Sequence, residues 1–202
     1  MRPRPLYSRV AVRLTATACA AALTLATMLV ATALPGGSPP VGAAAAAPRS
    51  TTDELVVWLD TRGNGAAGST YYDLEFTNLS THACSISGYP GVSALNFSGQ
   101  QLGNAAGHDA EHPATLITLS SGAAHEGLDG FATGNTATVV LQITDTGNYP
   151  PSTCASVAAA GLRVYPPDQT ASKIVPFPFG ACSRRGPLFL HVEAVQRGIV
   201  SD

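Results

Sequence analysis

Positive charge is scarce in this sequence, and much of it lies at the N-terminus. The 202 residues contain 11 Lys and Arg against 13 Asp and Glu, and the only lysine is Lys173. Four of the 11 cations are Arg2, Arg4, Arg9 and Arg13, so without this segment seven cations face 13 anions, a net charge of −6. Nucleic-acid binding requires a cationic face that displaces counterions. We therefore expect no nucleic-acid partner, and adsorption to an anionic membrane surface is disfavoured for the same reason.

Catalytic signatures are also missing. No Gly-x-Ser-x-Gly nucleophile elbow occurs, no Cys-x-x-Cys pair supports thiol redox chemistry, and no glycine-rich loop precedes a helix as a phosphate site requires. Five histidines and many serines are present, but no spacing singles out a triad, which is recognised by geometry. We expect a protein that is not an enzyme and that carries no cofactor. A hydrolase with a site assembled from several loops is kept as an alternative.

The first 45 residues have the layout of a secretory signal peptide. A basic segment precedes Leu14–Leu34, which is uncharged and mostly Ala, Leu, Thr and Val, and small residues follow in 41–47. We place the cleavage site after residues 43–46, followed by a flexible linker over 46–53 and one domain over 54–202. The sequence thus predicts a secreted, extracytoplasmic protein. The alternatives are an uncleaved membrane anchor, since the apolar run is long enough to span a bilayer, and a lipoprotein modified at Cys19.

Three cysteines remain once the signal is removed, namely Cys84, Cys154 and Cys182. An oxidising compartment favours one disulfide and leaves one thiol. We expect the pair Cys154–Cys182, which brackets two strands and a turn over 161–179 and stabilises the fold by roughly 3 kcal/mol. Cys84 is then a free thiol, buried as a small hydrophobic residue. A Cys84–Cys182 bridge is the main alternative.

Short apolar-rich runs separated by turn residues fill the rest of the chain. Alternation of apolar and polar residues, clearest over 72–78, is typical of half-buried strands. About nine such strands at this spacing predict an all-β domain, an antiparallel two-sheet β-sandwich of the immunoglobulin-like type, which we expect to be monomeric. The expected strands cover residues 55–59, 72–78, 83–86, 92–97, 115–119, 137–144, 162–165, 174–175 and 188–195, with 123–128 as a further candidate.

Three other features complete the expected fold. Gly63–Gly68 reads as a flexible turn, Pro176 and Pro178 mark an edge or irregular strand, and Ser152–Ala160 is the only helical candidate. The expected core residues are Trp58, Leu74, Phe76, Ile86, Leu95, Leu116, Val140, Ile143, Val164 and Val192.

Several short sequence motifs follow one another along this domain. They are Gly65-Ala66-Ala67-Gly68, Thr77-Asn78, Ala83-Cys84-Ser85-Ile86-Ser87-Gly88-Tyr89-Pro90-Gly91-Val92, Leu119-Ser120-Ser121-Gly122, Leu162-Arg163-Val164-Tyr165-Pro166-Pro167 and Gly180-Ala181-Cys182. Over about residues 55–195 the chain resembles the actinobacterial exported family catalogued as domain of unknown function 4232. The resemblance implies a secreted or envelope-associated β-sandwich. It implies no established activity, cofactor or catalytic residue.

The chain departs from this family at one position. Members often carry a further cysteine before the first strand, near where Thr51-Thr52-Asp53 stands here. If that cysteine normally pairs with the one matching Cys84, the resemblance accounts for the free thiol. It then also supports the pairing of Cys154 with Cys182.

Metal-ligating residue types cluster only in the segment His108-Asp109-Ala110-Glu111-His112. Two histidines at i and i+4 can share a metal on a helix, but Gly107 and Pro113 predict a loop here. We expect no metal, and a weak zinc or copper site at His108 and His112 is the first alternative function. His125 and Glu126 could contribute only if the fold brings them near.

The leading functional hypothesis is a non-catalytic envelope or secreted module that binds a protein or glycan partner. Its basis is an exported β-sandwich with long polar loops, because loops on a rigid scaffold usually carry recognition. Tyr89, in the Gly88–Gly91 turn, is expected to pack on the domain edge, with contact to a ligand as the alternative role.

Overall fold

The computed structural model describes residues 46–122 and 134–198, which belong to one compact unit. The predicted signal peptide and its cleavage site, the candidate strand Ala123–Leu128, and His125 and Glu126 lie outside the described residues. None of the described helices has the length and apolar character needed to cross a membrane.

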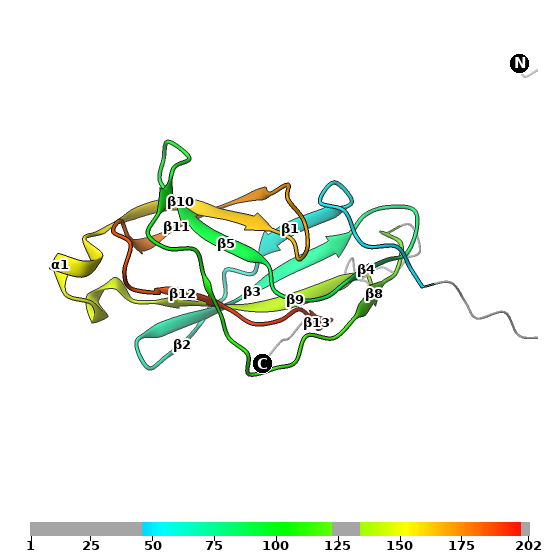
Figure 1. The fold of residues 1–202 in the computed structure, drawn as a ribbon, viewed down its shortest axis with the longest axis horizontal. Coiled ribbons are helices and arrows are strands. Elements are labelled where there is room, and N and C mark those ends of the chain that lie inside the picture. The colour runs from blue at the N-terminus through cyan, green and yellow to red at the C-terminus, as the bar shows by residue number, and fades with distance from the viewer. Residues whose placement is uncertain (1–45, 123–133, 199–202) are drawn as a thin grey trace, which may run out of the picture. The chain divides into compact units, whose positions relative to one another are not determined.

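The domain is all-β and consists mainly of two packed sheets, as the strand spacing predicts (Figure 1). The larger sheet has seven strands in the order β1-β3-β9-β12-β7, with β2 paired to β3 and β13 paired to β9. All pairings are antiparallel except β12 with β7. Its strands are β1 (Leu55–Leu59), β2 (Asn64–Ala66), β3 (Ser69–Asn78), β7 (Gly107–His108), β9 (Thr136–Thr144), β12 (Leu190–Val192) and β13 (Gln196–Arg197).

The smaller sheet has four antiparallel strands in the order β11-β10-β5-β6. A separate two-stranded sheet joins β4 to β8. The remaining elements are β4 (Cys84–Ile86), β5 (Gly91–Leu95), β6 (Gln101–Leu102), β8 (Ile117–Leu119), the 3-10 helix η2 (Thr146–Asn148), α1 (Pro151–Cys154), β10 (Ser156–Tyr165) and β11 (Lys173–Cys182).

The predicted helix over Ser152–Ala160 is wrong beyond Cys154. The α-helix ends at Cys154, and β10 begins at Ser156, opposite Cys182 of β11. The Ala-rich stretch is a strand because it pairs with β11 and because the Cys154–Cys182 bond fixes the two segments side by side. Tertiary pairing has overridden the helical preference of alanine.

The edge position of β11 agrees with its prolines. Pro176 and Pro178 lie within this ten-residue strand, which has a partner only on the β10 side. The register of the pair shifts between Ala159 and Gly161. A Cβ on Gly161 would lie 2.4 Å from the Val175 carbonyl oxygen, so this bulge requires glycine. Proline is tolerated at such an edge because it removes no ladder hydrogen bond there.

The core follows the period of two along each strand. In β9, Val139, Leu141 and Ile143 point inward, whereas Val140 points outward and is only half-buried. The prediction that Val140 belongs to the core is therefore wrong. The same holds for Trp58, which is also only half-buried. The prediction for Leu116 is wrong too. Leu116 is 61% exposed and precedes β8, whose Ile117 and Leu119 take the core positions. The other predicted core residues are buried, namely Leu74, Phe76, Ile86, Leu95, Ile143, Val164 and Val192.

The folded domain begins before the predicted start at residue 54. The Ser50 amide donates to the Ser85 carbonyl at 2.8 Å, and the Ser85 amide donates to the Pro48 carbonyl at 2.7 Å. Ser50 and Thr52 are buried. Part of the expected flexible linker over 46–53 therefore packs against β4.

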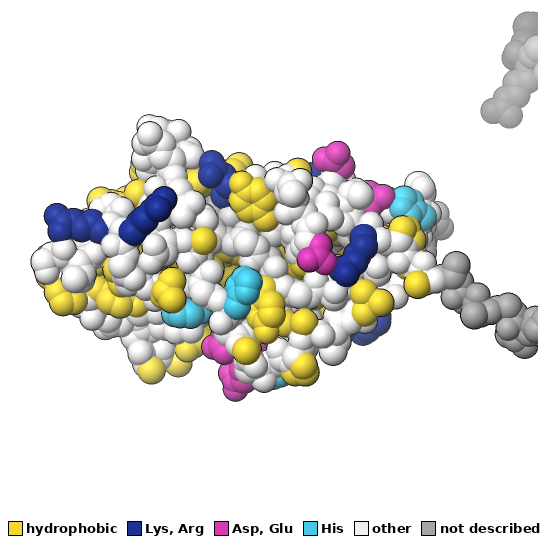
Figure 2. All heavy atoms as spheres, viewed as in Figure 1, with side chains coloured by type: hydrophobic (Ala, Val, Ile, Leu, Met, Phe, Trp, Pro, Cys, Tyr) yellow, Lys and Arg dark blue, Asp and Glu magenta, His cyan; other side chains and the backbone are white. Residues whose placement is uncertain are grey.

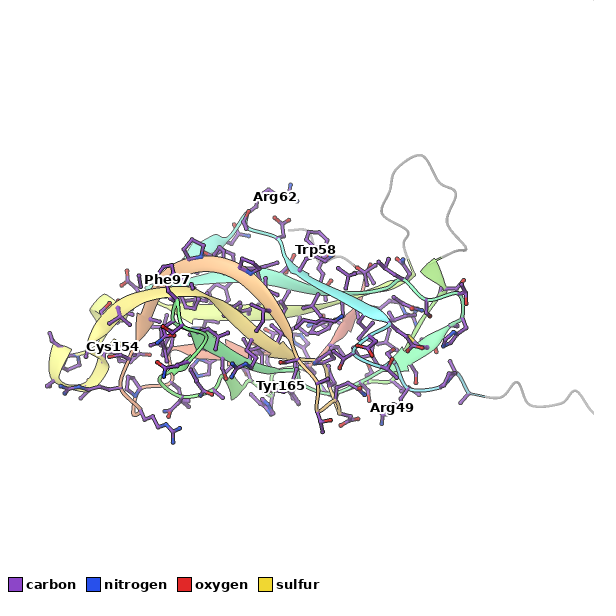
Figure 3. The ribbon with its side chains drawn as sticks, turned by 90° about the horizontal axis from the view of Figure 1, so that it is seen from above. Arg49, Trp58, Arg62, Phe97, Cys154 and Tyr165 are labelled. Atoms are coloured by element: carbon purple, nitrogen blue, oxygen red, sulfur yellow. A yellow bond between two sulfur atoms is a disulfide. The ribbon has the colours of Figure 1, made fainter. Side chains whose placement is uncertain are left out.

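Cys154 and Cys182 are joined by a disulfide, with an S–S distance of 2.06 Å and Cα atoms 4.5 Å apart. Figure 3 shows Cys154 at the α1 end of the domain, far from Arg49. The bond joins residues 28 positions apart and ties the end of α1 to the last residue of β11. Cys84 is free and buried.

Replacing both bonded cysteines, Cys154→Ser with Cys182→Ser, is expected to lower the free energy of unfolding by about 3 kcal/mol, because the unfolded chain loses a cross-link of this span. Urea unfolding followed by far-UV circular dichroism measures the change. As a control, a reductant should destabilise the wild type by the same amount and leave the double variant unchanged. Equal stability of the oxidised wild type and the double variant would contradict the expectation.

Candidate functional site

The two predicted metal ligands have different partners in the structure. His108 lies in β7, and its ring stacks on that of Tyr89, with centroids 4.6 Å apart and planes 8° from parallel. His112 follows in a loop, where its Nδ1 lies 3.2 Å from Oε2 of Glu193. The segment is not helical, so the i, i+4 arrangement does not form. Within residues 46–122 and 134–198, no three or more His, Cys, Asp or Glu side chains are placed to hold a metal ion.

Tyr89 contributes to the packing of this segment. Its hydroxyl donates to the His112 carbonyl oxygen at 3.5 Å, and its ring covers His108. Tyr89 and Glu193 therefore hold the 107–112 segment against the sandwich. This matches the edge-packing role expected from the sequence.

Cys84 is buried beside Ser50, whose hydroxyl contacts its sulfur. Burial raises the pKa of the Cys84 thiol above its ordinary value. A buried, protonated thiol is a poor nucleophile. Ser50 stands one residue before the segment where related chains are expected to carry a cysteine, and its contact with Cys84 explains how such a cysteine could pair there.

Glu75 is a buried carboxyl that the sequence did not single out. It lies in the middle of β3, and only 1% of it is exposed. Its neighbours Leu74 and Phe76 face the core, so Glu75 points to the outer face of the larger sheet. Its cross-strand neighbours there are Trp58 of β1 and Thr138 of β9. Trp58 lies on β1 in Figure 3.

The surroundings of Glu75 favour its protonated form. Its Oε2 has no hydrogen-bond partner among the described residues. Burial, with smaller contributions from the negative charges of Asp73 and Asp60, raises the pKa of Glu75 from 4.5 to about 7. The alternation of β3 predicts an outward position for Glu75 but gives no indication of its burial.

An open groove lies between the two sheets, beside the turn from β2 to β3. Its volume is about 580 Å³, within the range of roughly 300–1,000 Å³ of small-molecule sites. Residues from β2, β3, β9 and β11 and from the start of η2 contribute to it. They are Gly65, Ala66, Ala67, Gly68, Ser69, Thr70, Tyr72, Ile143, Thr144, Asp145, Thr146, Phe179 and Gly180.

The turn between β2 and β3 forms one wall of this groove. Ala67 and Gly68 both have positive φ, 49° and 78°, as a two-residue hairpin turn of type I′ requires. The Gly68 carbonyl oxygen accepts hydrogen bonds from the Asp145 amide at 2.9 Å and from Asn148 Nδ2 at 2.8 Å. These two bonds hold the turn against η2, although left-handed backbone is unfavourable for Ala67.

Aromatic side chains form the apolar part of the groove. Tyr72 points inward from β3 and meets Phe177 edge to face, with ring centroids 5.0 Å apart. Phe177 in turn stacks near Phe179, with centroids 5.8 Å apart. A Cβ on Gly63 would lie only 2.5 Å from Cε1 of Tyr72, so glycine lets the chain pass over this ring. These contacts fix the positions of the rings.

Charge is sparse in and around the groove. Asp145 is the only carboxylate among the lining residues, and no Lys, Arg, His or Cys is among them. Its Oδ1 accepts a hydrogen bond from the Gly147 amide at 2.7 Å. On the face shown in Figure 2, Lys and Arg side chains are scattered and form no continuous patch.

Sequence reasoning found only part of this groove. Gly63–Gly68 was expected to be a turn, whereas 64–66 form β2 and only Ala67 and Gly68 turn. Tyr72 and Phe179 were not singled out as site residues, because they are 107 positions apart and meet only through the packing of β3 and β11.

Comparison with known proteins identifies a family and nothing more specific. A family model described as "Domain of unknown function (DUF4232)" matches residues 50–196, a range that includes every residue lining the groove. No curated protein and no solved structure matches the chain.

The variant Ser50→Cys is expected to form a disulfide with Cys84, because the two side chains already touch. Thiol titration of the denatured, non-reduced variant, made without residues 1–45 and therefore without Cys19, should find no free thiol, whereas the wild-type domain of the same length has one. Thr52→Cys is the matched control, since Thr52 is equally buried but its hydroxyl bonds the Ala171 carbonyl. Two titratable thiols in the Ser50→Cys variant would contradict the expectation.

The stability of the fold is expected to fall as pH rises from about 4.5 to above 7. In this range the native state keeps the Glu75 proton that the unfolded chain releases, because the native pKa is about 7 and the unfolded value is 4.5. The raised pKa of Glu75 makes its full contribution to the free energy of unfolding below pH 4.5. This contribution, about 3 kcal/mol, is lost above pH 7.

Glu75→Gln, which stays neutral, should remove this pH dependence and be more stable than the wild type at pH 8. Urea unfolding at pH 5 and pH 8 measures both effects. Glu111→Gln is the control, because it removes an exposed carboxyl group of the same type. A wild-type minus Glu75→Gln difference that does not change with pH would contradict the assignment.

Proposed function

Because this chain belongs to the family described as "Domain of unknown function (DUF4232)", which names no activity, we propose its function from the structure and sequence. The protein is an exported, non-catalytic module that binds a cell-envelope partner in the groove between the two sheets.

The groove is the observation that carries this proposal. It joins the aromatic rings of Tyr72 and Phe179 to a larger share of polar surface, so it suits a ligand that has both apolar and polar faces. Its walls are held by hydrogen bonds to the Gly68 carbonyl and by contacts among Tyr72, Phe177 and Phe179. Fixed walls favour binding because little conformational entropy is lost when a ligand enters.

The chemistry of the lining supports binding without catalysis. General acid–base catalysis and covalent catalysis need a nucleophile or a pair of titratable groups within reach of one another. The lining offers one carboxylate, Asp145, and one phenol, Tyr72, with no histidine, cysteine or second carboxylate. Export is supported by the signal-like N-terminus and by the Cys154–Cys182 bond, since such bonds persist in oxidising compartments.

The variant Gly65→Leu tests this proposal. Gly65 pairs with Thr70, so its side chain would face the groove with Thr70, and a Cβ there meets no atom within 4 Å. The added side chain should fill the groove without disturbing the fold. In a pull-down from cell-envelope fractions, the wild type should retain a saturable partner and Gly65→Leu should lose it.

Asn64→Leu is the matched control. Asn64 precedes Gly65 in β2 and faces the other side of the sheet, opposite Tyr71, and it does not line the groove. This variant should bind as the wild type does. Retention of the partner by Gly65→Leu, or its equal loss in Asn64→Leu, would overturn the proposal.

A further inference from the structure

Resting on the proposed function, we propose that the ligand of this groove is a neutral saccharide. One face of a sugar ring lies on the aromatic floor, and its hydroxyl groups bond the free oxygen of Asp145 and the Tyr72 hydroxyl. A neutral polysaccharide of the envelope is therefore the class of partner that the groove fits.

The electrostatics of the lining favour a neutral ligand over an anionic one. Asp145 is the only charged side chain that lines the groove, and no lining cation could balance a phosphate or a sugar carboxylate. An anionic group entering the groove would be repelled by Asp145 without compensation. Hydroxyl groups, in contrast, form charge-assisted hydrogen bonds with a carboxylate, which are stronger than neutral ones.

Two polar groups of the groove have unused hydrogen-bonding capacity. Oδ1 of Asp145 accepts the Gly147 amide, whereas Oδ2 makes no hydrogen bond within the described residues. The Tyr72 hydroxyl also has no hydrogen-bond partner in this part of the chain, although its ring packs on Phe177. A sugar with hydroxyls at its edge supplies donors and acceptors for both groups.

The aromatic floor suits the apolar face of a sugar ring. Tyr72 and Phe179 both line the groove, and the ring of Phe177 contacts both of them. Aromatic rings bury a large apolar area, and C–H groups make weak favourable contacts with their faces. The amphipathic shape of a sugar, with C–H groups on its face and hydroxyls at its edge, matches a floor of rings beneath a polar rim.

An extended peptide fits this groove less well. Peptides that join a sheet need a strand edge with free amide groups at regular intervals. Two edge strands border the groove, namely β2, which has only three residues, and β11, where Pro176 and Pro178 have no amide hydrogen. Strand addition along β11 is therefore interrupted at two positions close to Phe179.

Titration of the full protein with neutral saccharides, followed by ¹H–¹⁵N NMR spectra, tests the inference. The probes are mono- and disaccharides of glucose, galactose, mannose, arabinose and N-acetylglucosamine, with galacturonate as the anionic counterpart of galactose. At least one neutral sugar should shift the Gly65–Gly68 and Thr146 resonances and bind more tightly than galacturonate. Gly65→Leu should abolish these shifts, and Asn64→Leu should preserve them.

The variant Asp145→Asn tests whether the negative charge of Asp145, and not only the shape of the groove, contributes to sugar binding. Asparagine keeps the oxygen that accepts the Gly147 amide, so η2 should stay intact. Binding of the neutral sugar should weaken by about tenfold, the effect of losing one charge-assisted bond, while galacturonate should bind more tightly than it does to the wild type. Unchanged affinity for both ligands would overturn the role given to Asp145.

The outcomes distinguish the two proposals. If no neutral sugar shifts the groove resonances while Gly65→Leu still abolishes binding to envelope fractions, the ligand class is wrong and the binding function stands, with a protein partner as the remaining occupant. Equal or tighter binding of galacturonate to the wild type would also overturn the saccharide inference. If Gly65→Leu keeps its envelope partner, the groove is not the binding site and both proposals fail.

Discussion

The long antiparallel pairing of β3 with β9 is the interaction on which the rest of the structure depends. It runs without a break from Ser69 opposite Thr144 to Thr77 opposite Thr136. Because side chains alternate between the faces of a sheet, this one register decides which residues enter the core and which face outward. A shift by one residue would place Leu74 and Phe76 outside the core and Glu75 within it.

The same register places both unusual features of the domain. At one end of the pair, Thr70 and Tyr72 of β3 and Ile143 of β9 point inward where the smaller sheet no longer covers them, and the groove begins there. In the middle of the pair, the opposite face carries Glu75 between Trp58 and Thr138. The groove and the buried carboxyl thus lie on opposite faces of one strand, three residues apart.

Much of the fold could be predicted from the sequence, because strong local patterns decided it. The strand over 55–59 coincides with β1, and the strand over 137–144 lies within β9, since both have runs of β-branched residues. The helix expected over Ser152–Ala160 failed beyond Cys154 because pairing with β11 outweighs the helical preference of alanine. Leu116 failed because β8 begins only at Ile117, and Ile117 and Leu119 take the inward face of that strand.

The candidate site was less accessible to sequence reasoning. The Gly63–Gly68 segment was predicted to be a turn, but the sequence does not show that η2 and β11 lie beside it. The burial of Glu75 could not be predicted, because its position in the alternating pattern is that of an ordinary surface residue. His108 and His112 attracted attention by residue type, yet their neighbours in space, Tyr89 and Glu193, are 19 and 81 positions away in the chain.

The disulfide has a consequence for when the groove is completed. Cys182 is the last residue of β11, two positions after Gly180 and three after Phe179, which together form the far wall. Oxidation therefore secures that wall. Under the proposed export, the groove is completed only in an oxidising compartment, where such bonds persist, and in a reducing environment the end of β11 lacks its covalent tie to α1.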